Sequence, residues 1–146
     1  MKTLNFSVKI NAPKERVWDN LWGTDTYPQW TAVFSEGSQA DSDWEEGSSV
    51  HFTDGTGNGM YGKIEKKVPN QRMTFKHLGM LKDGEEQPVD EKAKEWNGAI
   101  EDYQLNESGG VTDLKVSVDI TEDHKDFFQK TFPEALQKVK ELSEQS

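Results

Sequence analysis

The most constraining stretch of this sequence is its last one, residues 123–146, where apolar residues recur at spacings of three and four. They are Phe128, Phe132, Ala135, Leu136, Val139 and Leu142. This spacing places them on one face of an α-helix. Because proline interrupts helical hydrogen bonding, Pro133 predicts a short helix over residues 123–130 that runs into a longer one over residues 132–144. A helix this amphipathic needs a broad apolar surface to lie against.

The segments before this helix alternate apolar and polar residues, which is typical of strands with one buried and one wet face. The predicted strands cover residues 3–10, 47–53, 60–68, 72–78, 98–106 and 111–121. Two short helices are predicted after the first strand, over residues 13–22 and 25–30. Residues 35–43 are rich in Ser, Gly and Asp and predict a loop, whereas residues 91–96 predict a helical turn.

The order of these elements lacks the regular alternation of strand and helix that builds a parallel doubly wound sheet. It predicts an α+β fold in which a curved antiparallel sheet grips the C-terminal helix. Residues 98–106 and 111–121 should be adjacent strands, with the helix across the concave face of the sheet. A sheet and helix in this arrangement often close incompletely, and the gap between them is a pocket.

Composition narrows the classes of protein that this chain can represent. Its 146 residues suit one domain, and 10% aromatic content with five Trp indicates a folded core despite only 32% hydrophobic residues. The absence of Cys excludes disulfides and thiolate sites. A net charge of −10 argues against nucleic acid and anionic membranes as partners. No apolar run reaches the length of a membrane span or a signal peptide, so we expect no membrane insertion and a cytoplasmic protein.

Several short motifs occur in an order that a known superfamily shares. They are residues 10–13 (INAP) with Val17 and Trp18, Trp30, residues 62–64 (GKI), 68–70 (VPN), 73–75 (MTF), 110–114 (GVTDL) and 132–136 (FPEAL). Over nearly the whole chain this order resembles the START-like (SRPBCC) superfamily, and within it the bacterial group related to the activator of heat-shock ATPase (AHSA-like).

The resemblance implies one START-like domain over residues 1–146 with the helix-grip (Bet v-like) fold, and an apolar cavity between the sheet and the long helix. Members of the superfamily bind lipids, hormones or polyketides, some catalyse cyclisation, and some contact a chaperone. The fold alone does not choose among these functions.

Candidate ligand-binding residues are those that the predicted faces direct inward, together with aromatic residues near loops at the mouth of the pocket. The inward residues are Phe52, Met73, Phe75, His77, Glu101, Tyr103, Leu114, Val116, Phe128, Phe132 and Leu136, and the mouth residues are Trp30, Phe34 and Trp96. Packing these large side chains predicts a void on the order of a few hundred Å³.

Three polar residues stand out on these inward faces. His77 shares a strand face with Met73 and Phe75, and it is either a hydrogen-bonded structural histidine or a ligand contact. Glu101 shares a face with Tyr103, although Ile100 argues for the opposite register. Together His77, Glu101 and Tyr103 could bind a polar ligand head or move a proton.

Three functions remain open at this point. The first is a small-ligand-binding protein for an apolar or amphipathic molecule. The second is a cyclase or dehydratase-type enzyme that uses His77, Glu101 and Tyr103 as acid, base and anchor. The third is a protein-interaction module, such as a regulator of a chaperone ATPase. None of the three His residues, at positions 51, 77 and 124, has the spacing of a metal site, so we expect neither metal nor cofactor.

Overall fold

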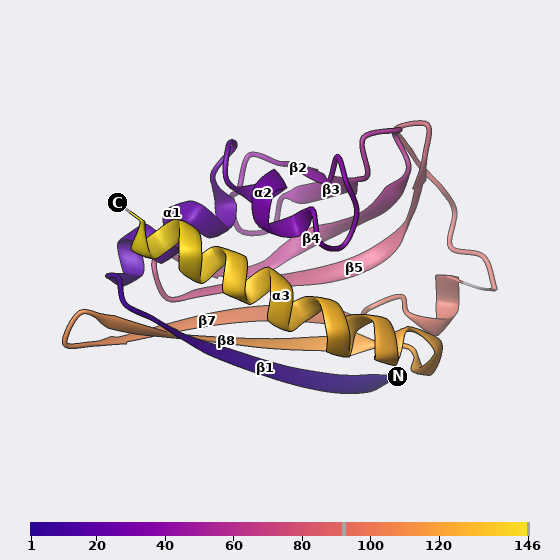
Figure 1. Ribbon diagram of the computed structural model, residues 1–146. Coiled ribbons are helices and arrows are strands. Elements are labelled where there is room, and N and C mark those ends of the chain that lie inside the picture. Colours follow the sequence, from indigo (N-terminus) through magenta and orange to yellow (C-terminus); the bar gives the residue numbers. More distant parts are fainter. Residues whose placement is uncertain (92, 146) are drawn as a thin grey trace.

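The computed structural model describes residues 1–91 and 93–145 (Figure 1). Its elements, in chain order, are β1 (Lys2–Ile10), α1 (Lys14–Trp22), α2 (Tyr27–Thr31), β2 (Gln39–Asp41), β3 (Ser49–Thr53), β4 (Gly59–Val68), β5 (Arg72–Lys82), β6 (Glu85–Glu86), η1 (Ala93–Glu95), β7 (Ile100–Ser108), β8 (Val111–Ile120), η2 (Glu122–His124) and α3 (Lys125–Glu144). The two short helices after the first strand confirm the prediction. None of the helices in the described ranges has the length and apolarity that crossing a membrane requires.

The strands form one antiparallel sheet in the order β1-β8-β7-β5-β4-β3-β2, and β6 pairs with the end of β5. In Figure 1 the sheet bends around α3, so that β1, β7 and β8 pass on one side of the helix and β2 to β4 on the other. The curved antiparallel sheet around a long C-terminal helix is therefore confirmed. The predicted neighbours β7 and β8 are paired, with Tyr103 opposite Val116 and Leu105 opposite Leu114.

Helix α3 differs from the prediction of two helices. It runs without interruption from Lys125 to Glu144, with Pro133 inside it. Proline removes the hydrogen bond to the carbonyl four residues back, which here belongs to Gln129. Both Gln129 and Pro133 are exposed, so water can solvate the freed carbonyl. Burial of the opposite face, where Phe132 and Leu136 are 3% and 2% exposed, holds the helix together across the break.

Smaller differences concern element boundaries. The predicted loop over residues 35–43 contains the short edge strand β2, which pairs with β3. Strand β5 continues four residues beyond the predicted end at residue 78. The predicted helical turn over residues 91–96 falls partly outside the described residues, and η1 occupies Ala93–Glu95. These differences leave the concave face of the sheet as predicted.

Candidate functional site

Three polar side chains meet on the concave face of the sheet. The His77 Nε2 atom lies 2.9 Å from Glu101 Oε1, and the Tyr103 hydroxyl donates a hydrogen bond to Glu101 Oε2. Both carboxylate oxygens of Glu101 therefore have a partner. We call His77, Glu101 and Tyr103 the inner polar cluster.

Strand pairing explains why these three residues meet. Strands β5 and β7 are antiparallel neighbours, with Phe75 opposite Glu101 and Met73 opposite Tyr103. Side chains two residues apart on a strand share a face, so Glu101 lies beside Tyr103, and His77 follows Phe75 on the adjacent strand. The backbone N–H of His77 donates to the backbone carbonyl of Ala99 at 2.9 Å, which extends the hydrogen bonding between the two chain segments to this position.

The uncertainty over residue 100 is resolved by the same register. Glu101 stands opposite Val118, whose side chain is buried in the core. The Ile100 backbone N–H instead donates to Asp119 Oδ2 at 3.0 Å. Glu101 therefore points to the concave face, as the alternation with Tyr103 predicts.

The backbones of β4 and β5 approach each other closely beside His77, and this contact helps to position the His77 side chain. Gly62 of β4 is the strand partner of His77, and the β4–β5 register shifts between Tyr61 and Gly62. A Cβ atom at Gly62 would lie only 2.4 Å from the Lys76 carbonyl oxygen. Glycine is thus required where the two backbones approach at this bulge.

Burial within the cluster is uneven. Tyr103 is 1% exposed, whereas the side chains of His77 and Glu101 are 11% and 24% exposed. Burial raises the pKa of the Tyr103 phenol well above its ordinary value, and the charge of Glu101 and the hydrogen bond to it add to that shift. Tyr103 therefore stays protonated and acts as a donor to Glu101.

Tyr27 of α2 is electrostatically coupled to the same carboxylate. Burial raises the pKa of the Tyr27 phenol far above its ordinary value, and the charge of Glu101 raises it further. Its ring also packs 5.4 Å from that of Trp30, measured between ring centroids. Trp30, whose ring lies 6.2 Å from that of Tyr103 between centroids, thus stands between Tyr27 and the inner polar cluster.

Two buried polar atoms near this region have no hydrogen-bond partner within the described residues: His77 Nδ1 and Trp22 Nε1. An unpaired polar atom of this kind costs about 1–3 kcal/mol of stability. Most buried polar atoms in proteins are paired, so exceptions in a native fold call for an explanation. A bound molecule that pairs with His77 Nδ1 would recover that cost.

The apolar surroundings consist of two groups of rings. The sheet-side ring cluster comprises Trp22, Trp30, Trp44, Phe52, Phe75 and Tyr103. The helix-side ring cluster comprises Phe6, Phe34, Phe128 and Phe132. No close ring pair among the residues in the described ranges joins one cluster to the other. The ring of Phe52, 5.4 Å from that of His77, brings the sheet-side cluster to the inner polar cluster.

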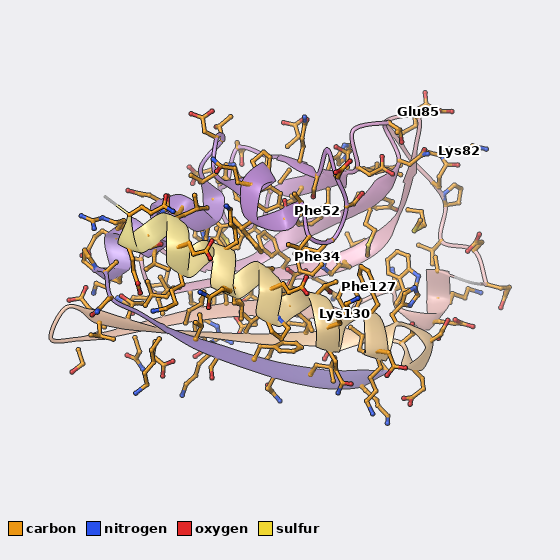
Figure 2. The ribbon with its side chains drawn as sticks, viewed as in Figure 1. Phe34, Phe52, Lys82, Glu85, Phe127 and Lys130 are labelled. Atoms are coloured by element: carbon orange, nitrogen blue, oxygen red, sulfur yellow. The ribbon has the colours of Figure 1, made fainter. Side chains whose placement is uncertain are left out.

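Figure 2 shows Phe34, Phe52 and Phe127 projecting into the region between α3 and strands β3 to β5. Phe34 and Phe52 are half-buried, and Phe127 is 45% exposed. Lys82 and Glu85 lie at the tip of the β5–β6 hairpin, away from these rings (Figure 2). Phe34 of the helix-side cluster and Phe52 of the sheet-side cluster are therefore each partly accessible to solvent.

The remaining predicted residues divide into packed and peripheral ones. Four of them are buried core residues at 0–2% exposure: Met73, Leu114, Val116 and Leu136. Trp30 is 1% exposed and donates from Nε1 to the Leu21 carbonyl at 3.0 Å, so the prediction that it lies at a pocket mouth is wrong. Trp96 is half-buried in the turn after η1 and belongs to neither ring cluster.

Two pockets are found in other parts of the molecule. One of about 270 Å³ lies on the outer face of the sheet and includes Asn5, Gln104 and Lys115 in its lining. The other, of about 230 Å³, lies beside α1, α2 and β2 and includes Trp22, Tyr27 and Trp44. Neither is the expected void between sheet and helix. The inward rings instead contact one another, as Phe52 does Phe75 at a centroid distance of 5.3 Å.

Sequence reasoning missed Trp22, whose ring lies 5.0 Å from that of Tyr103 between centroids, and Tyr27, whose ring packs on Trp30. The available signal was the spacing of Tyr27 and Trp30, three residues apart, which places both rings on one face of a short helix. Within the described ranges, no three His, Cys, Asp or Glu side chains gather as a metal site would need. His51 pairs with Glu86 at 2.8 Å, and exposed His124 lies 2.7 Å from Thr121 Oγ1.

Solved structures share this fold at low sequence identity. The Aha1 dimer from Colwellia psychrerythraea is 20% identical, with a TM-score of 0.76 over 99% of this chain and 98% of that one. Protein CV1439 from Chromobacterium violaceum is 16% identical, with a TM-score of 0.70 over the whole of both chains. CalU16 from Micromonospora echinospora is 17% identical, with a TM-score of 0.68 over 98% of this chain and 76% of that one.

A search of curated proteins found no match. A family assignment comes instead from the sequence itself, because residues 11–144 match the family described as "Activator of Hsp90 ATPase homolog 1-like protein". This match spans strands β5 and β7, which carry the inner polar cluster, and helix α3. The chain therefore belongs to the Activator of Hsp90 ATPase homolog 1-like family.

Proposed function

We propose that the protein binds a small amphipathic molecule on the concave face of its sheet. The polar end of the molecule meets the inner polar cluster, and its apolar body lies between the two ring clusters. The observation that carries this proposal is the buried, unpartnered Nδ1 atom of His77, which belongs to a His–Glu–Tyr cluster in an otherwise apolar core.

The free-energy cost of burying these polar side chains supports a role for them in ligand binding. A carboxylate is expensive to bury even when it is paired, and Met73, Phe75 and Val116 around it are apolar and 1% exposed. An apolar set of side chains would fill the same space without an unpaired atom. A ligand that completes the hydrogen bonding gives these polar residues a function that packing alone does not.

The boundary between the ring clusters is the route by which the apolar body enters. Rings within each cluster are held by edge and stacking contacts, such as that of Phe34 with Phe132 at 4.8 Å between centroids. Insertion between the clusters leaves in place the ring pairs that do not involve Phe34 or Phe52. Half-buried Phe34 and Phe52 lie on this route and would swing outward to admit the ligand.

The test is a titration of 2-naphthol, a fused ring with one hydroxyl, followed by NMR chemical shifts of the isotope-labelled protein. Binding should shift resonances of Phe52, His77 and Val118 and leave those of outward-facing Lys115 in place. Asp102→Asn is the matched control variant, because Asp102 adjoins Glu101 but faces the opposite side of the sheet. If 2-naphthol and similar amphipathic probes shift none of the inner residues at millimolar concentration, the small-molecule proposal is wrong and a protein partner takes precedence.

A second candidate function is proton-transfer catalysis on the same bound molecule. It is favoured by the hydrogen bond between His77 and Glu101, since a histidine paired with a carboxylate can act as a general base. An enzyme of the cyclase or dehydratase class would release water from its substrate, which mass spectrometry detects as a product 18 Da lighter. Glu101→Gln should then abolish product formation while the bound substrate remains detectable, and persistent turnover in this variant would exclude the role.

A further inference from the structure

We infer that the polar end of the ligand is a neutral hydrogen-bond donor, an alcohol or phenol hydroxyl, which donates to His77 Nδ1. This inference rests on the proposed function, because it specifies the chemistry of the same site. It follows from the directions of the hydrogen bonds around Glu101, taken one at a time.

The first direction is set by Tyr103. Its hydroxyl donates to Glu101 Oε2, and burial together with the charge of Glu101 keeps the phenol protonated. A carboxylate has no proton to donate, so its other oxygen must also accept. Glu101 Oε1 therefore accepts from whatever lies against it, which is His77 Nε2 at 2.9 Å.

The second direction follows from the chemistry of imidazole. A neutral imidazole carries one proton on its two nitrogens. Donation from Nε2 to Glu101 places that proton on Nε2, which leaves Nδ1 with a lone pair. Because this lone pair is buried and unpartnered, the complementary ligand group is an O–H or N–H donor.

Charge narrows the choice of donor. A carboxylate or phosphate on the ligand would meet the charge of Glu101 and the lone pair of His77, both of which repel it. An ammonium has three N–H groups that need acceptors, and His77 Nδ1 is the one unpaired acceptor found here within the described residues, so the cation would give up hydration that the site does not replace. A neutral hydroxyl on an apolar ring or chain satisfies Nδ1 without either penalty.

The first measurement determines the tautomer directly. Long-range proton–nitrogen correlation spectra of the ¹⁵N-labelled protein at pH 8 distinguish a protonated ring nitrogen from one with a lone pair. The expected result for His77 is a protonated Nε2 and an unprotonated Nδ1. A proton on Nδ1 would overturn the inference, since the ligand would then have to supply an acceptor.

The second measurement compares 2-naphthol with 2-methoxynaphthalene, which has the same rings but no donor. Calorimetry or NMR titration should give a preference for 2-naphthol of about tenfold, the effect expected when one buried acceptor is satisfied. His77→Leu should remove this preference, because leucine has no acceptor. His77→Asn should retain part of it, because the asparagine carbonyl oxygen can lie close to the position of Nδ1.

The outcomes separate this inference from the proposed function. Equal affinity for the two compounds in the wild-type protein, unchanged by His77→Leu, would show that an apolar site exists. It would also show that the ligand does not donate a hydrogen bond to His77 Nδ1. Binding of neither compound would overturn the proposed function and the inference together. Melting temperatures and amide spectra of both variants establish that the comparison is made on folded protein.

Discussion

Two adjacent carboxylates on β7, those of Glu101 and Asp102, face opposite sides of the sheet and have chemically different hydrogen-bond partners. Glu101 points inward and accepts bonds from His77 and Tyr103. Asp102 points outward, where Arg72 Nε and Nη2 bind its two oxygens at 3.0 and 3.2 Å and Thr74 Oγ1 donates at 2.6 Å. The outer carboxylate is paired with the guanidinium of Arg72, whereas the inner one is bonded to an imidazole and a phenol.

The pKa of Asp102 reflects this difference. Burial raises the pKa of its carboxyl, but hydrogen bonds from Arg72, Thr74 and Gln104 outweigh burial and hold the pKa below its ordinary value. Because Thr74 and Asp102 are strand partners, these bonds link β5 to β7. We therefore propose that the outer carboxylate stabilises the sheet and that the inner one takes part in ligand binding.

Truncation of a core side chain should lower the free energy of unfolding more than a change at either carboxylate. Leu136→Ala should lower the free energy of unfolding by about 2–5 kcal/mol, because a 2%-exposed leucine leaves a cavity when truncated. Lys138→Ala, two residues along α3, should cost under about 0.5 kcal/mol. Chemical denaturation of both variants measures the difference, and equal losses would contradict the helix register.

Asp102→Asn should be the next largest effect. The change removes the charge that Arg72 neutralises and should cost about 1–3 kcal/mol. The sign of the pH dependence follows from its lowered pKa: the stabilisation is fully present above the unfolded value of about 4 and is lost as pH falls through the folded pKa. Unfolding free energies of wild type and variant from pH 7 downward should therefore converge in acid. A gap that widens in acid would refute the assignment.

Tyr103→Phe tests the inner carboxylate's partner through the pH dependence of stability in alkaline solution. A phenol whose folded pKa is raised stabilises the protein below the unfolded value of about 10, and that stabilisation is lost as pH rises above it. The wild type should lose stability relative to the variant by about 1.4 kcal/mol for each pH unit above 10. Denaturation at pH 9, 10 and 11 tests this; parallel curves for the two proteins would mean that Tyr103 ionises as easily in the folded state as in the unfolded chain.

Glu101→Gln should have a smaller effect on stability than Asp102→Asn, below about 1 kcal/mol. Glutamine has the same shape, can accept from Tyr103 and donate to His77, and removes a half-buried charge. Thermal unfolding beside Asp102→Asn makes the contrast visible. A loss as large as that of Asp102→Asn would mean that both carboxylates hold the sheet together.

The parts of the fold that sequence reasoning predicted are those with a local repeat. Alternation of period two marked β1 and β8, and the spacing of Phe128, Phe132 and Leu136 marked α3. The continuity of α3 through Pro133 was not predictable in this way, because it depends on which side of the helix meets water. Strand β2, with three residues, is too short to show any period.

The candidate site was predictable only in part for a similar reason. Sequence alternation named His77, Glu101 and Tyr103, but Ile100 left the facing of β7 open until its register with β8 was known. The effect of the Glu101 charge on the pKa of Tyr27 links residues 74 positions apart, and whether His77 Nδ1 has a partner depends on all the atoms around it. Neither property can be predicted from the spacing of residues along the sequence.

The most direct test of the account is to measure 2-naphthol affinity and unfolding free energy together in Glu101→Gln and Asp102→Asn. We predict a crossed result. Glu101→Gln should keep its stability and bind 2-naphthol about tenfold more weakly, since the His77 proton can move to Nδ1 and remove the acceptor. Asp102→Asn should lose stability and retain wild-type affinity. If affinity falls equally in both variants, or only in Asp102→Asn, the inner polar cluster is not the ligand site.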